Sequence, residues 1–348
     1  MARNINGDSC HDYFIEKAPL KLSFKNNKER DFYEWQSDVR AKLWELLCMD
    51  RIEKCACPGE LQVECIEELD GYRRIRFTFM SEKDMAIPCY LLLPDTKEGE
   101  KVPLVITLQG HKKGGMYISV GISKNEVDAK YQPIAAYALQ AVRRGYAALC
   151  VELRGMGELI PSTSNRYRNL MCDYTAQTAL LLGRTVLGER VWDIMRAIDL
   201  LPAFPEIDTE KIAILGHSGG GTTAFYAACL DERIKVCMPS CSFCSFKRSI
   251  LDARHCVCNF IPGLYDWLEM ADLTSLIAPR RLAIVAGESD PAFMVDGVRD
   301  AFDTVEAIYD RLSAKENTEL VVTPMGHYWC EDLAYDALER AVKALGWR

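Results

Sequence analysis

Ser218 is the residue whose surroundings most strongly suggest chemistry. It lies in the string Gly216-His217-Ser218-Gly219-Gly220, directly after the short apolar run of residues 212–215. A serine between glycines at the end of a strand is typical of a sharp strand-to-helix turn that lifts the hydroxyl out of the sheet, where larger neighbours would collide. The alternative is an ordinary glycine-rich loop. A base and an acid within reach of the serine would favour the first interpretation.

The base is sought among five histidines, because a serine hydroxyl is a poor nucleophile unless a histidine takes its proton. His327 fits this role. It follows Gly326, just beyond the apolar run of residues 320–322, and so is expected on an exposed loop after the last strand. Its alternative role is to cap or fill a helix end. His217 is expected to face elsewhere, since adjacent residues on a tight turn diverge.

Two carboxylates, Glu288 and Asp290, follow the penultimate apolar run of residues 281–286. Asp290 is the better candidate for the acid that orients the histidine, because Gly287 begins the turn and Pro291 stiffens the chain directly after it. Its alternative role is to cap the helix expected from about Phe293, since aspartate is common at that position.

Acyl transfer also needs N–H donors for the charge that develops on the carbonyl oxygen. The backbone N–H of Gly219, at the start of the helix after Ser218, is one candidate. The second is expected from the loop Leu-Gln-Gly-His-Lys-Lys-Gly-Gly at residues 108–115, where we prefer the N–H of His111 to that of Lys112. The alternative is that this loop is a plain glycine-rich turn.

The order of elements along the chain predicts how these groups are positioned. From residue 102, short and continuously apolar strands alternate with helices, which is typical of a mostly parallel sheet covered on both faces. Before that, residues 31–50 have helical spacing, with an expected buried stripe of Trp35, Val39, Leu43, Leu46 and Leu47. Three further runs, residues 61–69, 72–80 and 86–94, are rich in strand formers and separated by short turns, so they predict antiparallel strands at a sheet edge.

These patterns predict an N-terminal extension of a helix and a β-hairpin over residues 1–85, followed by a catalytic α/β domain over residues 86–348. Two stretches of that domain, residues 154–177 and 240–275, are longer than ordinary connections and follow strands, where open α/β sheets place their ligands. We expect both to form walls of a substrate site. Their aromatic side chains suit either sugar stacking or the core; we favour the core for most of them and take Tyr167, Phe260 and Trp267 as substrate-binding candidates.

Composition limits the classes of partner. Of the 348 residues, 49% are hydrophobic and 26% charged, and the net charge is −8, so we expect a globular protein that binds neither nucleic acid nor membrane. The first residues lack the pattern of a secretory signal, and no apolar run approaches membrane-spanning length, which favours a cytoplasmic location. A homo-oligomer, a dimer, is expected if the N-terminal extension forms an interface; the alternative is that it covers a sheet edge.

The fifteen cysteines include three closely spaced pairs, at 55/57, 241/244 and 256/258. Only the 241/244 pair has the spacing of a zinc knuckle, and His255 lies beside a different pair. We therefore expect reduced and mostly buried thiols, with no metal site and no cofactor.

The succession Leu-Gln-Gly-His-Lys-Lys-Gly-Gly, Arg-Gly-Met-Gly-Glu, Gly-His-Ser-Gly-Gly, Gly-Glu-Ser-Asp-Pro and Met-Gly-His-Tyr-Trp resembles the α/β-hydrolase superfamily from about Ala86 to the C-terminus. Within it, the chain looks most like the dienelactone hydrolase and acetyl xylan esterase-like branch. The resemblance implies Ser218 as nucleophile, Asp290 as acid and His327 as base, in agreement with the residue-level reasoning. Dienelactone hydrolases proper carry a cysteine nucleophile where this chain has serine, which argues against lactone opening.

The resemblance implies a serine esterase without cofactor that acts on a small-molecule or oligosaccharide ester, with short acetyl esters of carbohydrates as the first expectation. A feruloyl esterase or general carboxylesterase is the alternative. A serine aminopeptidase is less expected, because the chain has no large N-terminal propeller and no evident amine-binding glutamate pair. A ligand-binding protein without catalysis is a further alternative, although all three catalytic groups are present.

Overall fold

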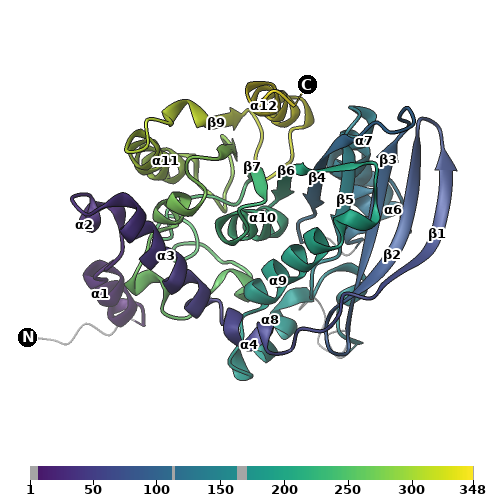
Figure 1. The fold of residues 1–348 in the computed structure, drawn as a ribbon. Coiled ribbons are helices and arrows are strands. Elements are labelled where there is room, and N and C mark those ends of the chain that lie inside the picture. The colour runs from purple at the N-terminus through teal and green to yellow at the C-terminus, as the bar shows by residue number, and fades with distance from the viewer. Residues whose placement is uncertain (1–6, 112–113, 163–170, 348) are drawn as a thin grey trace, which may run out of the picture.

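The computed structural model describes residues 7–111, 114–162 and 171–347. Its centre is one nine-stranded sheet in the order β1-β2-β3-β5-β4-β6-β7-β8-β9 (Figure 1). The strands are β1 (Leu61–Leu69), β2 (Tyr72–Glu82), β3 (Met85–Pro94), β4 (Val102–Leu108), β5 (Ala147–Val151), β6 (Ile207–His217), β7 (Ile234–Ser240), β8 (Arg281–Gly287) and β9 (Thr318–Thr323).

The helices follow the expected alternation with these strands. The α-helices are α1 (Ser9–Lys17), α2 (Phe24–Asn27), α3 (Phe32–Leu46), α4 (Met49–Glu53), α5 (Met116–Ser119), α6 (Glu126–Ala135), α7 (Tyr137–Arg143), α8 (Met171–Leu181), α9 (Val186–Asp199), α10 (Gly219–Leu230), α11 (Val295–Asp310) and α12 (Glu331–Ala344). Short 3₁₀ helices include η1 (Gly157–Leu159), η3 (Leu201–Ala203), η4 (Val257–Asn259), η5 (Leu264–Asp266), η6 (Met270–Leu276) and η7 (Lys315–Asn317).

The two ends of the sheet are built differently. Strands β1, β2 and β3 pair antiparallel, and β3 joins β5 antiparallel, whereas the strands from β5 to β9 all run parallel. The parallel strands β4 and β5 are buried along their whole length, because helices cover both faces of the sheet. The predicted division between antiparallel edge and parallel centre is therefore confirmed.

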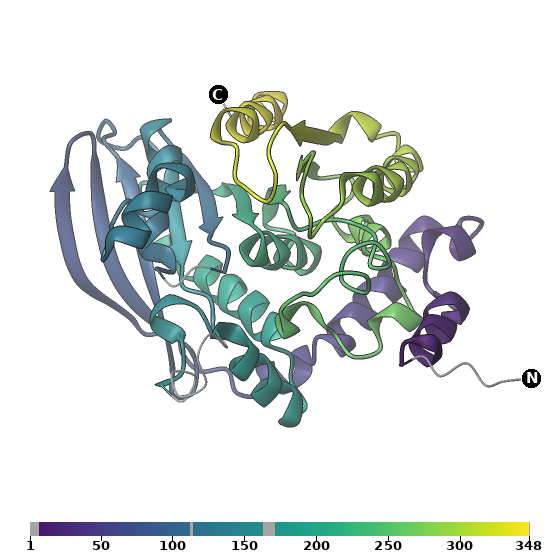
Figure 2. The ribbon, with the colours of Figure 1, turned by 180° about the vertical axis from the view of Figure 1, so that it is seen from behind.

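Alternate residues of the same strands contribute to two separate cores. Leu104 and Ile106 of β4 face the larger core with side chains of α3, α9, α10 and α11, whereas Val105 faces the smaller core with side chains of α7 and α12. Figure 2, seen from behind, shows the N-terminal helices at the end of the molecule opposite β1. The parallel strands thus form the middle layer of three, and their carboxyl ends carry the loops predicted to hold the site.

Helix α3 buries most of the predicted stripe. Trp35, Val39, Leu43 and Leu47 are at most 1% exposed, but Leu46 is only partly buried at the edge of the core. Helix α3 packs against the insertion and α10: Gln36 donates to the carbonyl of Ser275, and Arg40 donates to that of Cys229. Helix α3 is therefore packed against the rest of the chain through both side-chain burial and hydrogen bonds.

Helix α10 is buried in the core of the molecule. All of its residues, from Gly219 to Leu230, are buried, which is possible because α3, α9 and the sheet surround it. Among the residues described, no helix combines the length and the apolar character that a membrane crossing needs.

Candidate active site

The turn between β6 and α10 holds Ser218 in a backbone conformation that non-glycine residues rarely adopt, with φ +54° and ψ −126°. Its glycines are required by close approach. A Cβ on Gly216 would lie 2.4 Å from the Gly220 carbonyl oxygen, and a Cβ on Gly220 would lie 2.3 Å from that of Leu108. The expectation that larger neighbours would collide at this bend is confirmed by these distances.

Three side chains from three strand-ending loops form one hydrogen-bonded relay. The Nε2 atom of His327 lies 2.9 Å from the Oγ atom of Ser218, and its Nδ1 atom lies 2.8 Å from Oδ2 of Asp290. Nδ1 therefore donates to the carboxylate when Nε2 accepts from the hydroxyl. In that arrangement the imidazole can take the serine proton during attack on a carbonyl carbon.

Asp290 is placed to remain ionised. Its side chain has no exposed surface, while that of His327 is 30% exposed. Burial alone would raise the pKa of Asp290, but the hydrogen bond and charge of His327 and two backbone N–H donors outweigh it, so the pKa lies below its ordinary value. Those donors are the N–H groups of Ala292 and Phe293, which both bond Oδ1. Asp290 does not cap a helix, because α11 begins at Val295 with Met294 as its N-cap. Its Oδ1 atom instead accepts from the turn before that helix, while Oδ2 bonds His327.

The imidazole of His327 is held between two further rings. Phe293 stacks nearly parallel to it at 6.0 Å between ring centroids, with an interplanar angle of 13°. On another side the ring of His217 lies 5.1 Å away and approaches Ser240 through Nδ1 at 3.2 Å. The expectation that His217 faces elsewhere is therefore wrong: the tight turn directs its ring toward the same histidine that contacts its neighbour Ser218.

The loop after β4 lies directly against the serine. A Cβ on Gly110 would be only 3.1 Å from the Ser218 Cβ, and one on Gly219 would be 2.4 Å from the Cε1 atom of the His111 ring. Neither the N–H of His111 nor that of Gly219 has a hydrogen-bond partner among the residues described. The loop after β4 thus brings His111 next to Gly219, the other predicted donor residue, and places Gly110 against Ser218, a position that the sequence reasoning missed.

The buried carboxyl group of Glu152 holds the loop after β4 in place through hydrogen bonds. Its Oε1 atom accepts from Gln109 at 2.6 Å, and its Oε2 atom accepts from the N–H of Glu158 at 3.2 Å. Burial raises the pKa of Glu152 to about 8. A Cβ on Gly157 would meet Oε2 at 2.0 Å, which explains the glycine at that position. The Arg-Gly-Met-Gly-Glu string was the sequence signal for this support, although its role could not be derived from spacing.

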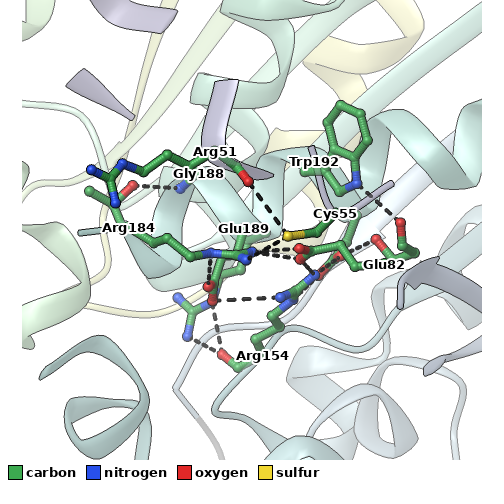
Figure 3. Close-up of polar contacts among 12 residues, drawn as sticks. Arg51, Cys55, Glu82, Arg154, Arg184, Gly188, Glu189 and Trp192 are labelled. Atoms are coloured by element: carbon green, nitrogen blue, oxygen red, sulfur yellow. Dashed lines mark hydrogen bonds and ion pairs between the residues drawn. The ribbon is translucent and has the colours of Figure 1, made fainter. Parts of the chain in front are cut away.

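A buried ion network adjoins the same string. Arg154 donates to both oxygens of Asp193 at 2.8 and 2.7 Å and pairs with Glu82 of β2 at 2.6 Å. Figure 3 shows Arg154 and Arg184 converging on Glu82 and Glu189. The network joins β2, in the antiparallel edge of the sheet, to α9 and to the segment after β5, so charge as well as packing holds these elements together.

The two predicted substrate residues that the structure describes, Phe260 and Trp267, have different surroundings. Tyr167 lies outside the described residues. Phe260 is 41% exposed at the end of η4. Trp267 lies under the ammonium groups of Lys21 and Lys42, which are 4.4 and 4.1 Å from its ring centroid. These contacts hold the N-terminal segment against the insertion. Among the other insertion aromatics, Phe243 and Phe246 are buried, as expected of core residues.

Cysteines from separate insertions meet beside the loop after β4. The Nε2 atom of His111 lies 3.1 Å from the Sγ atom of Cys172 in α8 and 3.3 Å from that of Cys258 in η4. Cys256 completes a group whose four ligand atoms all lie within 4.8 Å of one another. His255 takes no part, because it contacts Ser249 and the carbonyl of Ala292 instead. The sequence reasoning missed this group because Cys172 and His111 lie far from the 256/258 pair along the chain.

Comparison with known proteins shows which family and which relatives the chain resembles. Residues 10–320 match the family model described as the Abhydrolase family. The chain is 27% identical over 255 residues to YtaP of Bacillus subtilis strain 168, which is named as a hydrolase; the match covers 72% of this chain and 81% of YtaP.

Three solved structures illustrate the similarity in fold. A Bacteroides fragilis protein named as an acetyl xylan esterase has a TM-score of 0.76 at 18% identity, covering 97% of this chain and 96% of its own. Methylesterase BT1017 has a TM-score of 0.70 at 21% identity, covering 95% and 69%. A glucuronoyl esterase from Solibacter usitatus has a TM-score of 0.61 at 13% identity, covering 92% and 93%. The α/β-hydrolase fold predicted from the motifs, and with it the prediction of a hydrolase, are thereby confirmed.

Proposed function

Because this chain belongs to the Abhydrolase family, we propose that it is a serine esterase in which Ser218 is the nucleophile, His327 the base and Asp290 the acid that orients it. The observation that carries the proposal is the relay itself: a hydroxyl, an imidazole and a buried carboxylate joined at 2.9 and 2.8 Å. Ester cleavage by acyl transfer is the chemistry that such a relay performs.

In the proposed reaction, the Oγ atom of Ser218 attacks the ester carbonyl while its proton passes to Nε2 of His327. The resulting oxyanion accepts hydrogen bonds from the N–H groups of Gly219 and His111. His327 then protonates the leaving alcohol, and the carbon–oxygen bond of the ester breaks to give an acyl-enzyme. A water molecule, deprotonated by the same histidine, releases the carboxylic acid and restores the serine. None of these steps requires a cofactor.

We propose short acyl groups on carbohydrates, acetyl groups first, as the substrate. The support is indirect: three proteins of similar fold are named as esterases of acetylated xylan, of methyl esters or of glucuronoyl esters. The insertions 154–177 and 240–275 are the proposed walls, and Phe260 is the most exposed of their described aromatic side chains. Free oligosaccharides or small esters suit the cytoplasmic location expected from the sequence.

The decisive experiment replaces Ser218 by alanine and follows a chromogenic acetyl ester. We expect kcat/KM to fall by about 10⁴-fold or more, since the remaining donors and binding contacts alone retain little of the rate. A fluorophosphonate probe should label the wild-type chain but not the Ser218→Ala variant. Ser242 offers a control, because it is a serine just after β7 at the carboxyl edge of the sheet, but its hydroxyl has no hydrogen-bond partner among the described residues. Ser242→Ala should be labelled normally. Absence of labelling in the wild type would indicate a ligand-binding protein without an activated serine.

The substrate class is tested by a panel of acetylated xylo-oligosaccharides, methyl glucuronate esters, feruloyl esters and peptide amides. Acetylated sugars should give the highest kcat/KM. A preference for feruloyl or long-chain esters would retain the serine mechanism and replace the proposed substrate, whereas preferential amide cleavage would favour the aminopeptidase alternative.

A further inference from the structure

A group of soft and borderline ligands lies beside the serine turn, and its side chains have no part in the proposed ester hydrolysis. It consists of His111 after β4, Cys172 in α8, and Cys256 and Cys258 at η4. Cys172 and Cys258 are 1% and 4% exposed, while His111 and Cys256 are partly buried. Three thiol groups and an imidazole thus converge from three segments of the chain at one place that is closed on one side and reachable on the other.

The geometry of the group suits a single tetrahedral metal ion. Zinc binds thiolate sulfur at about 2.3 Å and imidazole nitrogen at about 2.0–2.1 Å, so a regular tetrahedron places its ligand atoms about 3.6–3.8 Å apart. The His111 Nε2 atom lies 3.1 and 3.3 Å from two of the sulfurs, and all four atoms lie within 4.8 Å of one another. Shifts well under 1 Å at His111 would bring the two nitrogen–sulfur separations to the tetrahedral value.

The surrounding charge also suits such an ion. Three thiolates and a neutral histidine around a doubly charged metal carry a net charge of −1. The guanidinium of Arg190, only 1% exposed, lies near the thiols of Cys172 and Cys258 and donates to the carbonyl of Arg154 at 2.9 and 2.6 Å. Among the described residues no carboxylate pairs with it, although a buried cation needs a counter-charge. An anionic metal–thiolate group supplies one.

Asp173 accepts two hydrogen bonds at this site, and one of them must break when a metal binds. Its Oδ1 atom accepts from the Cys256 thiol at 2.9 Å and from the N–H of Val257 at 3.0 Å. Metal binding removes the thiol protons, so the first of these bonds is lost with the Cys256 proton while the second still holds Asp173. The bound state therefore forms by release of up to three protons, with no oxidation or reduction.

We propose that His111, Cys172, Cys256 and Cys258 bind one zinc ion as a closed structural site that fastens the two insertions to the loop after β4. This inference goes beyond the proposed esterase function, because all four positions around the metal are occupied by protein atoms and none is left for a substrate or an activated water. Its role is positional: the ring of His111 lies directly against Gly219, so a metal that fixes His111 also fixes the loop beside the nucleophile.

The first test measures metal in the full chain, expressed without a polyhistidine tag and purified under reducing conditions. We expect about one zinc per chain after dialysis, because closed zinc–thiolate sites bind tightly. Replacement by Co²⁺ should produce the intense thiolate-to-metal charge-transfer absorption and the visible bands of a tetrahedral sulfur-rich site. A wild-type chain that retains no zinc, takes up none on titration and shows no such bands with Co²⁺ would overturn the proposal, as would a disulfide among the three cysteines that persists in reductant.

Matched cysteine pairs locate the metal. The double variant C256S/C258S should lose zinc and the Co²⁺ bands, whereas C55S/C57S, which has the same spacing in an exposed part of the chain, should retain both. The milder Cys256→Ser, at a partly buried position, covers the case in which the double variant fails to fold. Equal zinc content in C256S/C258S and wild type would assign the metal elsewhere. Because Ser218→Ala should keep its zinc, metal content and esterase activity can fail independently.

Discussion

Ser218 has a histidine on each side, and the two histidines are surrounded differently. His327 bonds a buried carboxylate through one nitrogen and the serine through the other, and 30% of its side chain reaches solvent. His111 lies among sulfur atoms, and its ring packs on Gly219. The same side chain is thus placed for proton transfer in one environment and for metal ligation in the other. The difference shows that the partners of the ring nitrogens, more than proximity to the serine, decide the chemistry of each ring.

Of the variants that test this difference between the two histidines, Asp290→Asn should have the largest effect on activity. An amide in place of the carboxylate no longer fixes the tautomer of His327 or stabilises the imidazolium, so kcat should fall by about 10⁴-fold. Turnover of a chromogenic acetyl ester measures it. Asp296→Asn, a neighbouring aspartate whose side chain is 75% exposed, should leave kcat unchanged. Activity of Asp290→Asn within tenfold of wild type would remove the carboxylate from the mechanism.

The Arg154→Met substitution tests the buried ion network of Arg154, Glu82 and Asp193, which adjoins the segment that supports the His111 loop. The substitution leaves Glu82 and Asp193 buried without their cation, and breaking a buried ion pair from one side costs about 3–5 kcal/mol. The free energy of unfolding from denaturant titration measures this loss. Arg340→Met, which breaks an exposed pair with Glu319, should cost about 0–1 kcal/mol. Equal costs for the two variants would show that burial of the Arg154 network adds nothing.

Substitutions at two glycines, one beside each histidine, test the two histidine environments separately. Gly219→Ala puts a methyl group 2.4 Å from the His111 ring, whereas Gly326→Ala, beside His327, meets nothing closer than 3.5 Å. We expect Gly219→Ala to lower kcat by about 10²-fold, the usual effect of losing one oxyanion donor, and Gly326→Ala to remain near wild type. Comparable kcat values for both variants would mean that the His111 side moves freely.

The smallest effect expected is on stability at low pH. The pKa of Asp290 is lower in the folded chain than its ordinary value of 3.8, so the unfolded chain binds a proton first as the pH falls. The stability that Asp290 contributes is complete above about pH 4 and is lost as the pH falls through the lower folded value. The difference in unfolding free energy between wild type and Asp290→Asn should therefore narrow below pH 4. A difference that stays constant down to pH 2 would contradict this.

The relay could be predicted from sequence because each of its members directly follows a buried strand. Ser218, Asp290 and His327 all come a few residues after apolar runs, and parallel strands bring their carboxyl ends to one edge of the sheet. The antiparallel edge and helix α3 were readable for a similar reason, since their periodicity is local. Leu46 was the exception, because a helix end at the edge of the core is shielded by fewer neighbours.

The cysteine group could not be predicted in this way. Its members come from a loop, the helix α8 and the 3₁₀ helix η4, and no periodicity relates residues 111, 172 and 256–258. Spacing drew attention to the 241/244 pair instead, although Cys244 contacts carbonyl groups of the core. The orientation of His217 and the lysine-covered position of Trp267 depend likewise on contacts between segments distant in sequence, which composition and spacing do not encode.

The burial of α10 along its whole length has a practical consequence for heat inactivation. The proposed nucleophile Ser218 immediately precedes a helix that has no solvent-facing side, so the serine turn cannot loosen while the core stays intact. Ester turnover should accordingly disappear over the same temperature interval as the near-ultraviolet circular dichroism of the core aromatics, and the activity remaining after brief heating can serve as a direct count of native molecules.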